Sequence, residues 1–283
     1  MTSDVPIHDK LPRVSVCIPT YNGAATIART IASVLNQSFT DFELVVVDDG
    51  SSDDTARIVA EARDTRVLYV RNESNLGPQG NWNRCLALAR APYIKVLPHD
   101  DLLAPNCLSR QVQILDADRE ARLALVFSAR CVIGPDDRVL IRSRGFRGLR
   151  EGPVDAARLM GACVRRGTNL IGEPGAVLFR KSISDCIGGF DATQPYVIDL
   201  DYWLRLLVHG DAHYCNEPLA SFRVWAGSWS VAIGAGQSAD FRSFVARMSK
   251  QGLLRATWLD RLIGQVTPSL NNLARRVFYR LLL

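Results

Sequence analysis

Up to about residue 120, short β-branched runs alternate with helical patterns, and this alternation limits the fold more than any other feature of the sequence. The predicted strands are nearly all apolar, which is typical of strands buried on both faces of a parallel sheet. Each is followed by a stretch with helical spacing of apolar residues. The expected pairs are Val14–Ile18 with Thr26–Asn36, Glu43–Val47 with Asp53–Ala62, Arg66–Val70 with Gly80–Arg90, and Tyr93–Leu97 with Pro105–Asp116. This order predicts an α/β fold with a mostly parallel sheet flanked by helices.

Beyond residue 120 the alternation becomes less regular. We expect strands at Leu123–Ser128, Arg138–Ile141 and Gly175–Arg180, and a short helix at Asp199–Val208. The first two strands flank a Gly-Pro-Asp-Asp sequence, which favours a turn and therefore a hairpin. Residues 238–283 contain two helical stretches, which we expect to be split at Pro268.

Two pairs of adjacent aspartates follow strands of the predicted sheet. Asp48 and Asp49 close one strand, and Asp100 and Asp101 follow another through a Pro-His turn. Adjacent carboxylates at the end of a buried strand repel each other and lose hydration, so they are costly unless a cation or ligand uses them. A single pair would be explained by capping of its loop. Two pairs at the carboxyl edge of one sheet, where open α/β folds bind ligands, predict a site that holds a divalent metal.

The composition indicates a globular chain without a spanning segment. Apolar residues make up 47% of the 283 residues, and no uncharged apolar run reaches the length of about 18 residues that a spanning helix needs. Residues 1–13 are polar and include acids, so we expect no secretory signal and a cytoplasmic location. The seven cysteines form no C-x-x-C pair and several lie in apolar runs, so we expect buried thiols.

The positive charge lies at the C-terminal end. The whole chain carries a formal net charge of +5, whereas residues 238–283 carry seven Arg and one Lys against two Asp. One helical face in this stretch is apolar and is flanked by Arg275, Arg276 and Arg280; its members are Leu270, Leu273, Ala274, Val277, Phe278, Leu281 and Leu282. Such a helix either packs on its own domain or lies on an anionic membrane surface. We expect no nucleic-acid partner.

Two large classes of nucleotide-binding protein lack their defining motif here. The turn after the first strand reads Pro-Thr-Tyr-Asn-Gly-Ala-Ala instead of G-x-G-x-x-G, and a Walker-A lysine is absent. The remaining type of nucleotide site is one in which an aromatic ring, carboxylates and a metal hold the nucleotide. In that arrangement Tyr21 packs on the base or ribose, and Asp49 accepts from a base N–H. Asp100 then accepts from ribose hydroxyls, and Asp101 holds the cation on the diphosphate.

The segment Val14–Thr55, which contains the IPTYNG and VVVDDGSSDDT sequences, resembles the opening of family 2 glycosyltransferases. The resemblance continues at His99–Asp101, Ile171–Ser182 and Ile198–Leu206, and covers roughly residues 13–225. It implies a Rossmann-like GT-A fold and an inverting transfer of sugar from a nucleoside diphosphate sugar, with UDP or dTDP. The implied acceptor is a glycan or lipid-linked molecule in cell-surface polysaccharide or glycolipid synthesis. We therefore expect an N-terminal segment (1–12), a GT-A domain (13–225) and a helical, basic, amphipathic extension (226–283).

The resemblance also implies roles for individual residues. Nucleoside-binding positions correspond to Pro19, Tyr21, Asp48 and Asp49, and the middle and last residues of His99–Asp101 correspond to a ribose contact and a ligand of Mn²⁺ or Mg²⁺. Asp199 stands where the family places the base that takes the proton of the acceptor hydroxyl. Without the resemblance, an Asp at a helix start is better explained as an N-cap.

Three positions depart from the family pattern. Ile198 replaces the usual acidic partner of the base. Trp225 stands near where many relatives carry a histidine that can join the metal site, so the metal would rest on Asp101 and the diphosphate. Trp82 replaces an arginine often found there, so Asn81 or Asn83 would supply the polar contact to the nucleotide.

Three residues are candidate acceptor contacts: Glu173, Trp203 and Trp225. Glu173 lies in a loop between Gly and Pro, where a carboxylate is more often solvated. Trp203 is better explained by the core face of its helix. A lipid-linked acceptor would be met at the bilayer, so we expect the basic C-terminal helix to hold the protein peripherally at the inner membrane face.

Two other functions compete with this interpretation. A nucleotidyltransferase that makes sugar nucleotides would need a basic, glycine-rich loop for a triphosphate, and Pro19–Ala25 contains no basic residue. A catalytically silent binding or scaffold subunit is the non-enzymatic alternative. The presence of Asp101 and Asp199 argues against it, whereas Ile198 and Trp225 argue for it.

Overall fold

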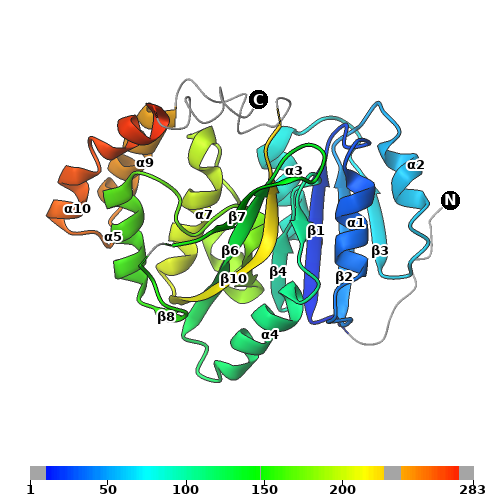
Figure 1. Cartoon of the computed structure of the whole chain (residues 1–283), viewed down its shortest axis with the longest axis horizontal. Coiled ribbons are helices and arrows are strands. Elements are labelled where there is room, and N and C mark those ends of the chain that lie inside the picture. Colours follow the sequence, from blue (N-terminus) through cyan, green and yellow to red (C-terminus); the bar gives the residue numbers. More distant parts are fainter. Residues whose placement is uncertain (1–10, 147, 226–236, 274–283) are drawn as a thin grey trace.

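The computed structural model describes residues 11–146, 148–225 and 237–273, which form a ten-stranded sheet flanked by helices (Figure 1). The order of the main strands is β3-β2-β1-β4-β9-β6-β10-β5, with β7 paired to β6 and β8 to β10. The sheet therefore has a parallel N-terminal half and a mixed C-terminal half.

The parallel half contains β1 (Val14–Thr20), β2 (Phe42–Asp48), β3 (Val67–Arg71) and β4 (Tyr93–Val96). Helices α1 (Ile27–Leu35), α2 (Thr55–Ala60), α3 (Gly77–Leu88) and α4 (Cys107–Ala117) follow these strands in turn. All eight predicted elements are confirmed, with bounds that differ by a few residues. Because β1 lies between β2 and β4, the loops that follow these three strands meet at one edge of the sheet.

The mixed half is built on β6 (Leu123–Ile133), β9 (Val177–Arg180) and β10 (Asp211–Arg223). β9 joins the two halves by pairing antiparallel with both β4 and β6, and β10 runs parallel to β6. The hairpin of β6 and β7 (Val139–Arg144) is confirmed, although β6 continues past its predicted end at Ser128. The short strands β5 (Leu102–Leu103) and β8 (Gly152–Val154) each pair antiparallel with β10, a strand that the sequence did not predict.

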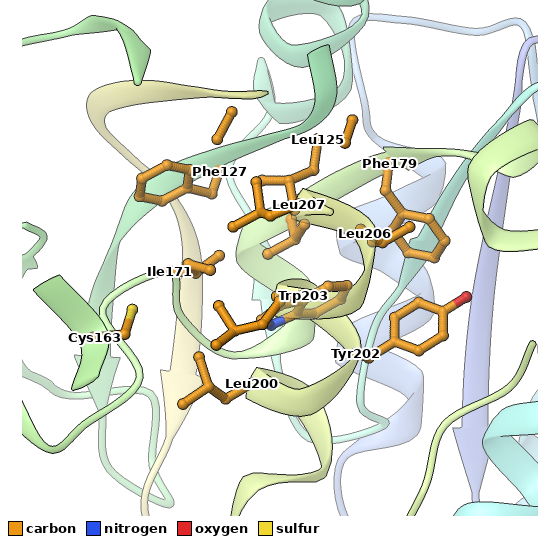
Figure 2. Close-up of a cluster of buried hydrophobic side chains, with 14 of the residues drawn as sticks. Leu125, Phe127, Cys163, Ile171, Phe179, Leu200, Tyr202, Trp203, Leu206 and Leu207 are labelled. Carbon is orange, nitrogen blue, oxygen red and sulfur yellow. The ribbon is translucent and has the colours of Figure 1, made fainter. Parts of the chain in front are cut away.

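Helices α5 (Ala156–Arg166), α6 (Lys181–Ile187) and α7 (Ile198–Leu207) complete this half. One hydrophobic cluster forms where α7 packs on β6 and β9 (Figure 2). There Trp203 is 0% exposed and lies against Phe179 and Phe190 at ring-centroid distances of 5.7 and 6.2 Å. The predicted acceptor contact of Trp203 is therefore wrong, because a ring enclosed by the core presents no surface to a ligand.

The described part of the C-terminal extension consists of α9 (Gln237–Lys250), α10 (Trp258–Ile263) and a helical segment at 267–273. The expected split near Pro268 is confirmed, because turn residues 264–266 separate α10 from that segment and Pro268 lies in its first turn. A second break, which the sequence did not predict, falls between α9 and α10. Residues 226–236 and 274–283, with most of the predicted amphipathic face, lie outside the described residues. No described helix is long and apolar enough to cross a bilayer. All seven cysteines are free thiols, and five of them are buried.

Candidate active site

The carboxylate of Asp48, at the end of β2, is hydrogen-bonded to other residues of the protein. Its Oδ1 accepts hydrogen bonds from the Ser51 backbone N–H at 2.8 Å and from the Ser51 hydroxyl at 2.5 Å, and its Oδ2 accepts from the Tyr69 hydroxyl. Burial, followed by this neighbouring carboxylate, raises the pKa of Tyr69 to about 12. Asp48 is 0% exposed and both its oxygens accept hydrogen bonds within the protein, so its nucleoside contact stays a prediction. It shapes the loop on which Asp49 sits.

Asp49 has one oxygen engaged with the protein. Its Oδ1 accepts from the Asn72 side-chain amide at 2.7 Å and from the Leu76 backbone N–H at 2.8 Å. Asn81, on α3, supports the loop that carries Asp49. Its amide donates to the carbonyl of Val47 at 3.0 Å, and its oxygen accepts from the side-chain amide of Asn72. The amide and the oxygen of Asn81 are both hydrogen-bonded within the protein and the residue is 3% exposed, so it supports the loop of Asp49, and its contact to a nucleotide stays a prediction.

The turn after β1 brings the two aspartate loops together. Pro19 is buried within the strand, whereas Tyr21, just beyond it, is 49% exposed. A Cβ at Gly23 would collide with Oγ1 of Thr20 and would lie 3.1 Å from the ring of His99. This close approach places the turn that carries Tyr21 against the His99–Asp101 turn.

Asp100 and Asp101 are held by the end of β10. Oδ1 of Asp101 accepts from the Arg223 backbone N–H at 2.9 Å, the Arg223 Nε donates to the Asp100 carbonyl at 2.7 Å, and the indole N–H of Trp225 donates to Oδ2 of Asp100 at 3.1 Å. Burial, and then the adjacent Asp100, raise the pKa of the Asp101 carboxyl well above its usual range. No described residue donates to its second oxygen.

This pair fits a divalent cation that shares its coordination with a ligand. No group of three or more His, Cys, Asp or Glu side chains among the described residues is placed to bind a metal by itself. Mg²⁺ commonly uses one or two carboxylates and takes its other oxygens from water and phosphates. A buried carboxylate with a raised pKa and one oxygen to which no described residue donates is a suitable anchor for such an ion.

Asp199 lies inside the first turn of α7. Its Oδ2 accepts from the Asn169 side-chain amide at 2.9 Å, and its Oδ1 accepts from the Leu200 backbone N–H at 2.7 Å. The residue preceding the helix is Val197, so Asp199 is not the N-cap and the capping interpretation is wrong. Burial, followed by the charge of Glu173, raises the pKa of the Asp199 carboxyl to about 7.

Glu173 connects the two acidic centres electrostatically. Its Oε2 forms an ion pair with Nε of the buried Arg130 at 2.5 Å. Burial raises the pKa of the Glu173 carboxyl, but Arg130 and Arg144 outweigh that effect and leave it lowered, so Glu173 is charged at neutral pH. Its charge contributes to the raised pKa of both Asp101 and Asp199. The site therefore contains Asp101, next to Asp100, and Asp199, and the charge of Glu173 acts on both Asp101 and Asp199.

Comparisons with known proteins agree with this geometry. Residues 15–188 match the family model described as glycosyl transferase family 2. The chain belongs to glycosyl transferase family 2. It is 37% identical to an uncharacterized protein of Mycobacterium tuberculosis, over 83% of this chain and 74% of that protein. It is also 38% identical, over 36% of this chain and 34% of the other, to the GalNAc(5)-diNAcBac-PP-undecaprenol beta-1,3-glucosyltransferase of Campylobacter jejuni.

Solved structures show the same GT-A fold. The Staphylococcus aureus TarS structure in complex with UDP-GlcNAc superposes with a TM-score of 0.67 at 18% identity, covering 83% of this chain and 66% of that one. The mannosyltransferase PcManGT of Pyrobaculum calidifontis, in complex with GDP-Man and Mn²⁺, gives a TM-score of 0.64 at 18% identity, covering 95% and 76%. The predicted family and fold class are thus confirmed for this chain.

Three residues of this family 2 glycosyltransferase site were missed from the sequence: Arg130, Asn169 and Arg223. Arg130 and Arg223 belong to strand regions that were not predicted, and both are almost fully buried, at 3% and 1% exposure. Asn169 lies in the loop after α5, where its amide oxygen also accepts from the backbone N–H groups of Ile171 and Gly172 at 3.0 Å. An isolated Asn in a Gly-Thr-Asn sequence carries no signal beyond that of a turn.

Proposed function

We propose that this protein is an inverting, metal-dependent glycosyltransferase. It would transfer a sugar from a nucleoside diphosphate sugar to a glycan or lipid-linked acceptor in cell-surface polysaccharide or glycolipid synthesis. The observation that carries the proposal is the arrangement in which Asp199, held by Asn169, shares the charged neighbour Glu173 with the Asp100 and Asp101 pair. The Campylobacter glucosyltransferase and the UDP-GlcNAc complex of Staphylococcus TarS support transfer of a sugar from a nucleotide donor and leave its base open.

The donor would lie over the edge formed by β1, β2 and β4. The exposed ring of Tyr21 offers a stacking surface for the base or ribose, and Asp49 offers its second oxygen to a base N–H. Asp100 would accept from ribose hydroxyls while Trp225 holds its other side. In this arrangement Trp225 orients a donor-binding carboxylate and makes no acceptor contact.

Asp101 would hold Mn²⁺ or Mg²⁺ on the diphosphate. When bound, such an ion offsets the charge that develops on the leaving group, by roughly 4 kcal/mol for a charge pair about 4 Å apart at an effective dielectric near 20. The backbone N–H of Arg223 keeps Oδ1 of Asp101 in place, which leaves Oδ2 for the ion.

Asp199 would take the proton from the acceptor hydroxyl as it attacks the anomeric carbon from the face opposite the diphosphate. A general base works best when its pKa is near the working pH, and the value of about 7 meets that condition. Asn169 orients the carboxylate, and Glu173 supplies the acidic neighbour that Ile198 does not. A single base without a protein nucleophile gives inversion.

The test is release of nucleoside diphosphate from a panel of UDP, dTDP and GDP sugars, with Mn²⁺, Mg²⁺ or EDTA and with water as the acceptor. We expect one donor class to turn over with metal only. Asp199→Asn should lower the rate by about 10² or more while donor binding and Tm stay unchanged. The matched control is Asp185→Asn, because Asp185 lies on α6 with its side chain 59% exposed.

Other outcomes would refute parts of the proposal. An Asp199→Asn variant with the rate of the unmodified chain would exclude this base. Donor binding without turnover in either protein, across the whole panel, would instead indicate a silent binding subunit.

A further inference from the structure

The hairpin of β6 and β7 extends along the candidate site from the aspartate pair to the proposed base. At its turn, Asp137 pairs at 2.5 Å with Arg223, which also holds the aspartate pair that follows β4. At its other end, Arg144 lies directly opposite Arg130 in the β6–β7 ladder. Two residues that face each other in an antiparallel ladder project to the same face of the sheet. Arg144 therefore shares the face on which Arg130 pairs with Glu173.

Arg130 connects this end of the hairpin to Asp199 through the loop after α5. Its guanidinium lies against Gly172, because a Cβ at Gly172 would be 3.2 Å from Nη1 of Arg130. Gly172 has a φ of +116°, which only glycine adopts without strain, and this conformation permits the close approach. The Gly172 carbonyl accepts from the side-chain amide of Asn169 at 3.0 Å, and the same amide donates to Asp199 at 2.9 Å. This end of β7 is thus the one beside the proposed base.

Positive charge exceeds negative charge at this end of the hairpin. Arg130 is 3% exposed and is paired with Glu173, whereas Arg144 is exposed and forms no ion pair with any described residue. Burial raises the pKa of Glu173, but the charge of Arg130, and then that of Arg144, lower it. Two guanidinium groups therefore act on one ionised carboxylate. When Asp199 takes up the proton of the acceptor hydroxyl it becomes neutral, so two positive charges then stand against one negative charge.

We propose that Arg144 binds an anionic group, a carboxylate or a phosphate, on the sugar that accepts the transfer. This assignment rests on the proposed function, because it takes Asp199 as the base that the acceptor hydroxyl meets. A guanidinium presents its N–H donors in a planar fork that matches the oxygens of a carboxylate or a phosphate. Glu173 accepts from a hydroxyl of the same sugar, and Arg144 donates to its anionic group.

The diphosphate of the donor fits Arg144 less well than the acceptor does. In the ladder of β6 and β10, Ile133 of β6 pairs with Arg223, whose backbone N–H binds Asp101. Arg130, which faces Arg144, lies three residues before Ile133, and three residues of a strand span roughly 10 Å. The backbone of Arg144 is therefore displaced along the sheet from Asp101, where the diphosphate would lie.

The test is binding of the full chain to an array of neutral oligosaccharides and oligosaccharides that carry uronic acid or phosphate. We expect tighter binding to the anionic glycans, weakening with salt. Arg144→Gln should bind them at least about tenfold more weakly, with unchanged Tm and unchanged affinity for nucleoside diphosphate with Mn²⁺. The matched control is Arg119→Gln, because Arg119 is also exposed but follows α4.

The source of the anionic group is identified by competition. Methyl glucuronide, methyl glucoside 6-phosphate and methyl glucoside share one sugar ring and differ only at C6. Displacement of the bound glycan by the glucuronide assigns a carboxylate, and displacement by the 6-phosphate assigns a phosphate. The neutral glucoside should compete at least about tenfold more weakly than the better anionic competitor, since it offers the guanidinium no charge.

Three results would overturn the proposal. No preference for anionic over neutral glycans would exclude a charged acceptor. An Arg144→Gln variant that loses affinity for nucleoside diphosphate instead would assign this guanidinium to the donor. Loss of anionic glycan binding in Arg158→Gln/Arg255→Gln, with Arg144→Gln unaffected, would assign binding to the cavity that Arg158 and Arg255 line between α5 and α10. Glycan binding is measured without turnover, so it can fail or succeed independently of the glycosyltransferase assay.

Discussion

At the level of single residues, Glu173 and Asn169 act on Asp199 with opposite sign. The charge of Glu173 raises the pKa of Asp199, whereas the Asn169 amide donates to the charged carboxylate and lowers it. A base is active when deprotonated, so the rate should rise with pH through about 7. We expect Glu173→Gln to move this rise to lower pH and Asn169→Ala to move it to higher pH, measured as pH profiles of kcat/KM.

The direction of these shifts separates electrostatics from structural damage. Both variants disturb the same loop, so a purely structural effect would lower the rate in both without opposite shifts of the profile. Asp185→Asn, which also removes an acidic charge, should leave the profile in place because its carboxylate is exposed on α6.

Asp101 supports ligand binding at the expense of stability. Its pKa is raised by burial and by Asp100, so its ionised form destabilises the fold at every pH above the ordinary Asp value. We expect Asp101→Asn to unfold at the same or higher urea concentration at pH 7 and to bind nucleoside diphosphate at least about tenfold more weakly with Mn²⁺ by calorimetry. An equal loss of affinity in EDTA would contradict the metal role.

At the level of elements, one guanidinium joins β10 to the β6–β7 turn. Arg223 is 1% exposed, donates to the Gly134 and Asp100 carbonyls at 2.7 Å, and pairs with Asp137 at 2.5 Å. We expect Arg223→Met to lower the free energy of unfolding by about 3 kcal/mol, because buried carbonyls and a carboxylate lose their partner. Arg29→Gln removes an exposed pair to the same Asp137 and should cost less than about 1 kcal/mol, measured by urea unfolding.

At the level of the whole molecule, α9 belongs to the core of the domain. Phe241, Phe244 and Met248 are at most 1% exposed and join the hydrophobic cluster built around α7. We expect a chain ending at residue 236 to lose at least about 5 kcal/mol, since burying each such side chain stabilises by roughly 1.5–3 kcal/mol. A chain ending at residue 257 should keep one cooperative transition by circular dichroism. Similar stability of the two truncations would show that α9 is dispensable.

The parallel half of the sheet and the family were readable from the sequence because both depend on local patterns. Apolar runs, helical spacing and the Asp48-Asp49 and Asp100-Asp101 pairs are each contained within a few consecutive residues. They predicted β1 to β4 and their helices, whereas Asp199 was singled out by the resemblance of Ile198–Leu206 to the family. Burial on both faces of a parallel strand leaves a continuous apolar run, which is a strong signal in a single sequence.

Only the tertiary structure decided which polar groups are free to bind a ligand. Asp48 and Asn81 are predicted ligand contacts, and the structure shows that both are hydrogen-bonded to residues brought together by the fold. Strand β10 places Arg223 beside Asp101 across more than one hundred residues, and no local pattern encodes such a pairing. The pKa of Asp199 likewise depends on burial, which is a property of the assembled chain and not of its spacing.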